Sequence, residues 1–267
     1  MRDSDCTGGE GMKLTARNYF SKRANMEYMS VSQFKAFEKC QHAALGEITG
    51  KYKRESTTAL LVGSFVDAYF DGELDAFKEK NPDIFKRDGT LKADYSQAGE
   101  IIARIERDKL FMRYMTGERQ VIMTGVINGV PVKIKIDSLH PDKIVDGKIM
   151  RDFENVYDSE KGLQPWFEAW GYDLQGAVYQ EIVRQNTGKR LPFYLAAATK
   201  EKTPDIDIVH IGQNMLDFSL ERFARNVTEY DAIKKRVIPA ERCEKCEYCK
   251  NTKKLKAPTE AEDFYLI

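Results

Sequence analysis

The stretch from Val121 to Met150 constrains the fold most, because it predicts three consecutive strands of one sheet. Asn128 and Gly129 separate two apolar runs, and both residues readily adopt the positive φ angles that a tight hairpin turn requires. After this turn, apolar residues alternate with polar ones as far as Asp137, which is the period of a strand with one buried face. A second turn then leads into a third predicted strand at 144–150.

Three charged residues on these strands form a candidate site. Asp137 closes the second strand, while Asp146 and Lys148 lie two residues apart on the third strand and so share one face of it. Two carboxylates at close range hold a hard cation such as Mg²⁺. Such an ion polarises a phosphate and lowers the pKa of a bound water, and a lysine can orient that water. The three residues therefore suit hydrolysis of a phosphodiester, although an Asp-x-Lys pair alone is also common on ordinary solvated hairpins.

Length and charge limit the class of protein. A chain of 267 residues can bury the core of one α/β domain. It contains no run of about 18 apolar residues and no apolar signal core near Met1, so we expect no membrane span and a cytoplasmic location. The formal net charge is +0, which gives no overall attraction to nucleic acid, but the segments 51–54 and 234–256 are locally basic.

The remaining pattern predicts one domain at 28–256, a flexible lead-in at 1–27 and a tail at 257–267. The segment Ser30 to Gln33 predicts a capping box that opens the first helix. Further elements are expected as helices at 57–70, 166–186 and 215–236, strands at 191–198 and 206–211, and a polar helical cover over the site at 71–117. This order predicts an α/β or α+β fold with a mixed central β-sheet flanked by helices.

Three further residues are candidates for the same site. Asp67 lies in a nearly apolar helix, where a carboxylate is costly unless it is paired or binds a metal. Alternatively, Asp67 shares a solvent-facing strip with Ser64. Gln175 and Tyr179 lie one helical turn apart and can both face a phosphate or a nucleobase. The alternative for this pair is a buried tyrosine beside a neutral glutamine.

The cysteines predict a second metal site. Three of them have C-x-x-C-x-x-C spacing, namely Cys243, Cys246 and Cys249. A tetrahedral site needs a fourth ligand, for which Cys40 on the first predicted helix is a stronger candidate than Cys6 or His210. Four thiolates suit either zinc or a [4Fe-4S] cluster, and the spacing does not separate the two. Either would join the segment 240–252, here called the clasp, to the first helix, whereas three free thiols are the alternative.

In the region 28–254 the chain resembles the PD-(D/E)XK nuclease superfamily, and within it the RecB-like and RecE-like exonucleases of phage and prophage recombination modules. Four motifs occur in the family's order: Gly63-x-x-x-Asp67, with Asp in place of the family's His; the metal-binding Asp137 at a strand end; the acidic-x-Lys motif Asp146-Gly-Lys148; and Gln175-x-x-x-Tyr179 on the following helix. Each motif is weak alone, and the four in order are a strong signal.

The resemblance implies a restriction-endonuclease-like core and a role for each residue. Asp137 and Asp146 would hold Mg²⁺ or Mn²⁺ with help from Asp67, and Lys148 would position the attacking water. Two other residues would steer the DNA strand, namely Gln175 and Tyr179.

The four cysteines Cys40, Cys243, Cys246 and Cys249 resemble those of iron–sulfur nuclease domains such as that of AddB-type helicase–nucleases. Relatives of this kind act on DNA, are often encoded beside a single-strand annealing protein, and many form homo-oligomers. Two other classes of function remain open. One is a catalytically silent DNA-binding or scaffold module with the same fold. The other is a metal-bound interaction protein unrelated to nucleases, which predicts that the three acidic candidates and Lys148 are not grouped in space.

Overall fold

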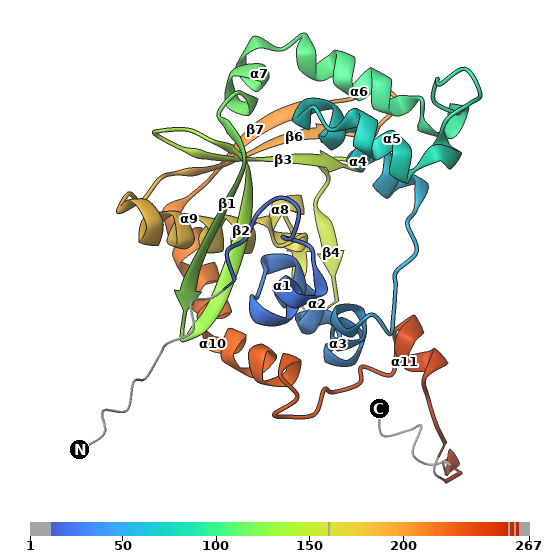
Figure 1. Ribbon diagram of the computed structural model, residues 1–267, viewed down its shortest axis with the longest axis vertical. Helices are drawn as coiled ribbons and strands as arrows, with labels where there is room; N and C mark the ends of the chain where they lie inside the picture. The colour runs from blue at the N-terminus through green and yellow to red at the C-terminus, as the bar shows by residue number, and fades with distance from the viewer. Residues whose placement is uncertain (1–11, 160, 256, 259, 262–267) are drawn as a thin grey trace.

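A mixed five-stranded sheet forms the centre of the computed structural model, which describes residues 12–159, 161–255, 257–258 and 260–261 (Figure 1). Its order is β1-β2-β3-β6-β7, with bounds β1 Glu118–Ile127, β2 Val130–Leu139, β3 Ile144–Met150, β6 Phe193–Thr199 and β7 Ile206–Ile211. Neighbouring strands are antiparallel except β3 and β6, which are parallel. The predicted α+β class with a mixed central sheet is therefore confirmed.

The hairpin between β1 and β2 forms as its turn residues predict. Asn128 and Gly129 have φ angles of 46° and 77°. Because the turn fixes the register, Ile127 pairs with Val130 and Val121 pairs with Ile136. The parallel pair β3 and β6 needs a crossover, which the helices α8 and α9 supply.

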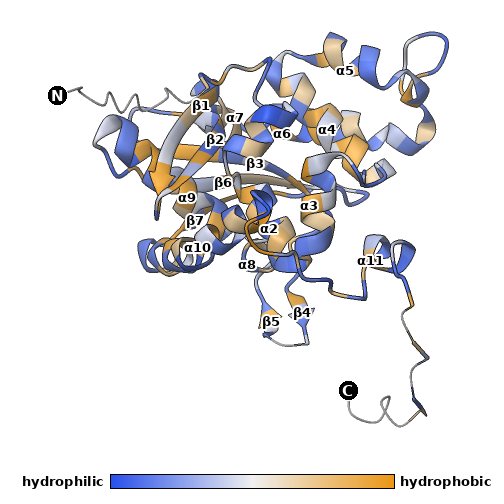
Figure 2. Ribbon diagram, turned by 60° about the horizontal axis from the view of Figure 1, so that its bottom comes forward, coloured by the Kyte–Doolittle hydropathy of each residue, from blue (hydrophilic) through white to orange (hydrophobic). Residues whose placement is uncertain are grey.

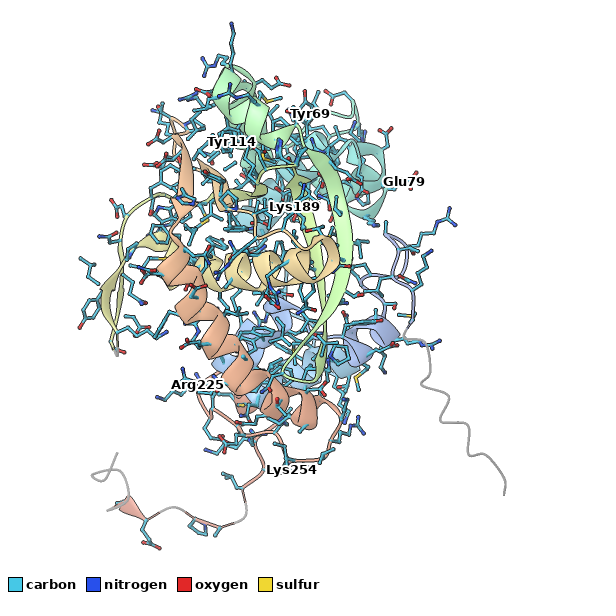
Figure 3. All side chains as sticks on the ribbon, turned by 90° about the vertical axis from the view of Figure 1, so that its left-hand side faces the viewer. Tyr69, Glu79, Tyr114, Lys189, Arg225 and Lys254 are labelled. Atoms are coloured by element: carbon cyan, nitrogen blue, oxygen red, sulfur yellow. The ribbon has the colours of Figure 1, made fainter. Side chains whose placement is uncertain are left out.

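One face of the sheet packs against helices from both ends of the chain. They are α1 Lys22–Glu27, α2 Val31–Lys39, α3 Gln41–Thr49, α9 Tyr172–Thr187 and α10 Gln213–Lys234. Alternate residues of β2, namely Val132, Ile134 and Ile136, are fully buried in this core together with Phe34 and Phe223. Figure 3 shows α9 and α10 crossing over this face.

The other face of the sheet is covered by the segment that begins with α4 and ends before β1. It holds α4 Thr58–Asp71, α5 Leu74–Lys80, η1 Pro82–Ile84, η2 Ala93–Tyr95, α6 Gln97–Glu106 and α7 Lys109–Met115 (Figure 2). The prediction that residues 71–117 form a polar cover is wrong for α6. Ile101, Ile102 and Ile105 are buried there and share a core with Val145 and Ala196 of the sheet. This segment is a second packed layer.

The N-terminal segment is more structured than expected. Residues 12–27 include α1, and Tyr19 and Ala24 are buried. The backbone of Met29 exchanges hydrogen bonds with β2, at Pro131 and Lys133. The prediction of a flexible lead-in is therefore wrong for residues 12–27. Residues 1–11, with Cys6, lie outside the described residues, as does most of the predicted tail at 257–267.

Several element boundaries refine the predictions. Ser30 and Gln33 form the predicted capping box at the start of α2. The helix expected at 166–186 is two helices, α8 Trp166–Ala169 and α9, because the chain turns at Gly171 with a φ of 63°. A small ribbon formed by β4 Val156–Asp158 and β5 Gly162–Gln164 occupies part of the expected loop.

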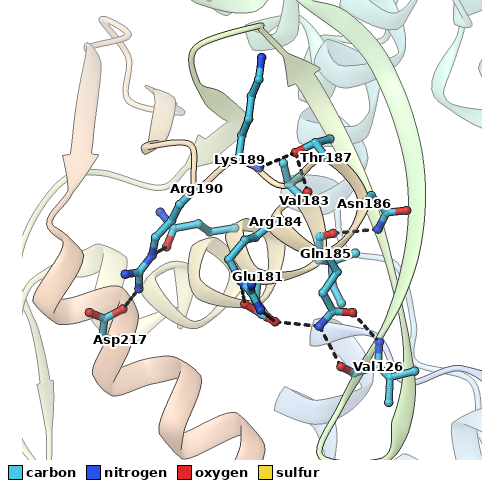
Figure 4. A network of polar contacts seen from close by, with 12 residues as sticks. Val126, Glu181, Val183, Arg184, Gln185, Asn186, Thr187, Lys189, Arg190 and Asp217 are labelled. Carbon is cyan, nitrogen blue, oxygen red and sulfur yellow. Dashed lines mark hydrogen bonds and ion pairs between the residues drawn. The ribbon is translucent and has the colours of Figure 1, made fainter.

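The end of α9 is tied to the edge strand β1 (Figure 4). The side chain of Gln185 accepts a 2.9 Å hydrogen bond from the Val126 N–H and donates a 2.8 Å bond to the Val126 carbonyl. Asn186 donates to the carbonyl of Thr124. These contacts fix α9 along the β1–β2 hairpin. No helix among the described residues is long and apolar enough to cross a membrane.

Candidate active site and cysteine cluster

A cavity of about 540 Å³ lies between α2, α4, α9 and the strands β1, β2 and β3. Its wall contains every residue predicted for the acidic site: Asp67, Asp137, Asp146, Lys148, Gln175 and Tyr179. Residues separated by more than a hundred positions in the chain are thus brought to one cavity. This grouping contradicts the hypothesis of an interaction protein unrelated to nucleases, which predicts that these residues are not grouped in space.

Asp146 and Lys148 form an ion pair on β3. Asp146 is almost fully buried, and the Lys148 ammonium lies 5.0 Å from the centre of the Tyr172 ring. Burial lowers the pKa of Lys148, but the nearby Asp146 and Asp137 outweigh it, so the pKa is raised above its ordinary value. Lys148 therefore carries a positive charge at neutral pH.

Asp146 is held on its other side by α9. The Gln175 side chain donates a 2.8 Å hydrogen bond to Asp146 Oδ1, while Oδ2 faces Lys148. Both carboxylate oxygens are thus oriented, one by Gln175 on α9 and the other by Lys148 on the same strand. Gln175 contacts the acidic residue directly, which differs from the DNA-steering role that its motif suggested.

Asp137 on β2 faces the same cavity. Its Oδ2 accepts a 3.0 Å hydrogen bond from the backbone N–H of Gly147. Burial, together with the charge of Asp146, raises the pKa of Asp137 to about 8. A cation bound beside Asp137 would favour its ionised form.

Gln120 is a site residue that the motifs did not reveal. It lies opposite Asp137 on β1, since the flanking pairs are Arg119 with Ser138 and Val121 with Ile136. Its side-chain amide donates a 2.8 Å bond to Asp71 on α4 and a longer bond of 3.4 Å to Asp137. Its backbone has a φ of 53°, which is unusual for a residue with a side chain. The hairpin register predicted from Asn128 and Gly129 could have identified it.

Asp67 lines the cavity from α4 and remains exposed to solvent, as does Ser64. Desolvation by the surrounding protein raises the pKa of Asp67 to about 6. The charge of Lys148 opposes this rise in pKa, and the charge of Asp71 adds to it. At Gly63, one turn earlier, α4 lies against β3, and an added Cβ would make an ordinary 3.7 Å contact with Ile149. Asp67 therefore faces the cavity and solvent at once.

Tyr179 does not fit the expected role of steering DNA. Its hydroxyl donates a 2.9 Å hydrogen bond to the backbone carbonyl of Lys135, and its side chain is buried. Burial raises the pKa of Tyr179 well above its ordinary value, so it stays a neutral donor. Tyr179 thus ties α9 to β2 directly beneath the cavity.

The sequence profile of a family described as "PDDEXK-like domain of unknown function (DUF3799)" matches residues 30–252. The chain belongs to this family. The crystal structure of a protein from Eubacterium rectale, named "putative exonuclease", is similar to this PDDEXK-like chain at 47% sequence identity and a TM-score of 0.90. The match covers 95% of this chain and 98% of that one. Among curated proteins, none is matched.

Membership of the PDDEXK-like family and this neighbour support a nuclease, and they confirm the resemblance found in the sequence. The donor set of the acidic site fits a hard divalent cation, because Asp67, Asp137 and Asp146 supply only oxygen ligands.

The PDDEXK-like core carries the predicted cysteine cluster, defined here as Cys40, Cys243, Cys246 and Cys249. Their four sulfur atoms all lie within 4.8 Å of one another and could hold a metal ion. Cys40 stands at the junction of α2 and α3, and the other three surround the start of α11 Glu247–Asn251. Of the two weaker candidates, His210 is not part of this group, because its ring packs against Tyr194 on the sheet, and Cys6 lies outside the described residues.

Proposed function

We propose that this chain is a divalent-metal-dependent deoxyribonuclease that acts as an exonuclease on DNA ends. The observation that carries the proposal is the Asp146–Lys148 ion pair beside Asp137 in one cavity. This combination places oxygen ligands for a divalent cation and the positive charge of Lys148 in the same cavity. The exonuclease activity is supported by the family resemblance and by the name of the Eubacterium rectale protein. A role in phage or prophage recombination beside a single-strand annealing protein is supported by the family resemblance alone.

Each residue has a distinct part in the proposed reaction. Asp137 and Asp146 would hold Mg²⁺ or Mn²⁺, with Asp67 on the opposite wall as the third ligand. When bound, such an ion polarises the phosphate and lowers the pKa of water. The ammonium of Lys148 orients the attacking water and balances charge on the phosphate oxygens. Gln175 keeps Asp146 in a fixed orientation through its 2.8 Å hydrogen bond.

The test compares DNA substrates that differ only in their ends. End-labelled linear duplex, nicked circle, linear single strand and covalently closed circle are incubated with Mg²⁺, Mn²⁺ or a chelator. An exonuclease degrades the linear substrates when metal is present and leaves the closed circle intact. Cleavage of the closed circle would show an endonuclease. The absence of cleavage on all substrates would favour the catalytically silent DNA-binding module.

We further propose that the cysteine cluster holds a single zinc ion. The sulfur–sulfur distances are 3.5 Å for Cys40–Cys249, 3.8 Å for Cys40–Cys246 and 4.0 Å for Cys243–Cys249. Four sulfurs at 2.3 Å from one tetrahedral zinc lie about 3.8 Å apart. In a [4Fe-4S] cluster each thiolate binds a different iron atom, so the sulfurs are more widely separated. The spacing in this structure therefore supports one ion over the cluster.

Metal analysis of protein purified without oxygen separates the two alternatives. One zinc per chain in a colourless protein would support the proposal. Iron with acid-labile sulfide in a brown protein would show a [4Fe-4S] cluster. The role expected of zinc is structural, because all four ligand positions are taken by cysteine and none remains for substrate.

A further inference from the structure

One face of β2 leads from the N-terminal segment to the acidic site. Lys133, Lys135 and Asp137 alternate along the strand, so their side chains follow one face in steps of about 7 Å. All three residues line the cavity; Lys133 is buried, whereas Lys135 and Asp137 keep partial exposure. A strand of nucleic acid lying along this face would pass from Lys135 to the candidate metal ligand.

Lys133 fixes the segment before α1 onto this face. Its ammonium donates hydrogen bonds to the Tyr19 carbonyl and, at 2.7 Å, to the side-chain oxygen of Asn25. It also lies 4.5 Å from the centre of the Tyr19 ring, and Tyr19 is buried. Figure 1 shows this blue segment beside β2. The residues around Tyr19 are therefore held in place by the strand.

The next residue, Phe20, is held at the cavity mouth with its ring in solvent. Phe20 lines the cavity, yet 71% of its surface is exposed. Its ring meets Tyr19 edge to face, with centroids 4.9 Å apart, and the Lys135 ammonium lies 5.6 Å from its centre. An exposed aromatic ring on an anchored segment, next to a cation, is the arrangement that proteins use to stack a base and hold its phosphate.

Two lysines that line the cavity, one on α2 and one on β2, are available for phosphate groups. Neither Lys35 nor Lys135 forms an ion pair with a carboxylate among the residues that the structure describes. The Lys35 ammonium donates a 2.9 Å hydrogen bond to the Trp170 carbonyl and lies 5.2 Å from the Tyr172 ring. With Phe20 between solvent and Lys135, the cavity offers one stacking surface and two cations.

We propose that Phe20 and Lys135 bind the nucleotide next to the scissile phosphate, with its base stacked on Phe20 and its phosphate on Lys135. A base can stack on a side chain only when it is unpaired, so the substrate class at this site is an unpaired strand. The cavity volume of about 540 Å³ suits one or two nucleotides and not a duplex. This inference rests on the proposed nuclease function.

The experiment measures binding of a labelled single-stranded oligonucleotide by anisotropy, with Ca²⁺ replacing Mg²⁺ to slow cleavage. Phe20→Ala and Phe20→Leu should both weaken binding roughly 10-fold, and Phe20→Trp should retain it, because stacking needs a ring and not only apolar surface. Tyr157→Ala is the matched control, since Tyr157 is 74% exposed on β4 and does not line the cavity. Thermal unfolding of each variant checks the fold.

An abasic oligonucleotide sharpens the test. If one base stacks on Phe20, removing that base should weaken binding to the wild-type protein but should have little further effect on Phe20→Ala. Moving the abasic position along the oligonucleotide should locate one sensitive position close to the cleaved bond.

Three results would overturn the inference. They are unchanged single-strand binding by Phe20→Ala, equal losses for single strand and for closed duplex, and additive losses at every abasic position. In each of these cases metal-dependent cleavage by the wild-type protein can still establish the nuclease. A wild-type protein that neither binds nor cleaves DNA would instead contradict the proposed function itself.

Discussion

Gln175 on α9 donates a 2.8 Å hydrogen bond to Asp146 on β3, and this contact joins the crossover helix to the candidate metal ligand. Asp146 is almost completely buried, so the direction of its carboxylate depends on this amide and on Lys148. The arrangement explains why a glutamine stands on this face of α9. In the proposed function its part is to orient Asp146, a candidate metal ligand.

Gln175→Ala should weaken the apparent affinity for Mg²⁺ by about 10- to 100-fold, because loss of a residue that orients a metal ligand has effects of this size. Titration of cleavage rate against Mg²⁺, together with calorimetric metal binding, measures the change. Gln185→Ala is the matched control on the same helix, since Gln185 bonds to the backbone of Val126 far from the cavity. Equal Mg²⁺ affinities for the two variants would contradict this role.

Two substitutions at Gln120 should distinguish the effect of its backbone conformation from the effect of its side-chain contacts. Gln120→Val should lower the free energy of unfolding by about 1–2 kcal/mol, because a branched residue is strained at a φ of 53°. Gln120→Gly should leave stability almost unchanged, since glycine adopts this conformation freely. Both variants lose the amide contacts with Asp71 and Asp137 and should need more Mg²⁺. Urea unfolding and metal titration test this, and a stable Gln120→Val would show that the strained conformation is not required.

The clasp should depend on the absence of a side chain at Gly46. A Cβ at this position would lie 2.8 Å from the ring of Tyr248, which stacks on His42 and Tyr52 beside the cysteines. Gly46→Ala should therefore displace α11, destabilise the protein by about 1–3 kcal/mol and speed metal loss to a chelator. Gly99→Ala on α6 is the control, because nothing lies within 4 Å of its added Cβ. Equal metal retention by both variants would argue against tight packing of the clasp.

Lys234 makes stability depend on pH. It is fully buried, 3.7 Å from Asp231, and burial lowers its pKa to about 8 despite that carboxylate. Between about 8 and the ordinary value of 10.5, the unfolded chain binds more protons at this residue than the folded protein, so this contribution to stability rises with pH.

Lys234→Met should therefore be more stable than the wild-type protein at pH 7, by about 1–3 kcal/mol, and the advantage should shrink between pH 8 and 10.5. Asp231 keeps an ion pair with Lys235 in this variant. Urea unfolding at several pH values provides the measurement. An advantage that does not change with pH would mean that Lys234 keeps its ordinary pKa in the folded protein.

Local sequence signals predicted the elements that are determined by interactions between residues close together in the sequence. Asn128 and Gly129 define a hairpin through their own backbone preferences, and alternation along β3 places Asp146 and Lys148 on one face. The helix start at Ser30 follows from its capping box. These signals, with the order of the motifs, were sufficient to predict the mixed sheet and six of the residues that line the cavity.

The features that sequence could not supply depend on contacts between distant segments. Lys133 has the spacing of an exposed residue on an alternating strand, but the segment around Tyr19 covers it. The partner of Gln175 depends on how α9 lies across β3, and the burial of Ile101 depends on which face of α6 meets the sheet. No local pattern specifies these placements.

In the proposed reaction Lys148 acts on the substrate while the aspartates hold the metal, and one substitution separates these two roles. Wild-type protein and Lys148→Ala are compared for Mg²⁺-dependent degradation of linear DNA and, by calorimetry, for Mg²⁺ binding. We expect a loss of rate by orders of magnitude with metal binding retained. Unchanged degradation by Lys148→Ala would contradict this role of Lys148, because the activity would then belong to a different site.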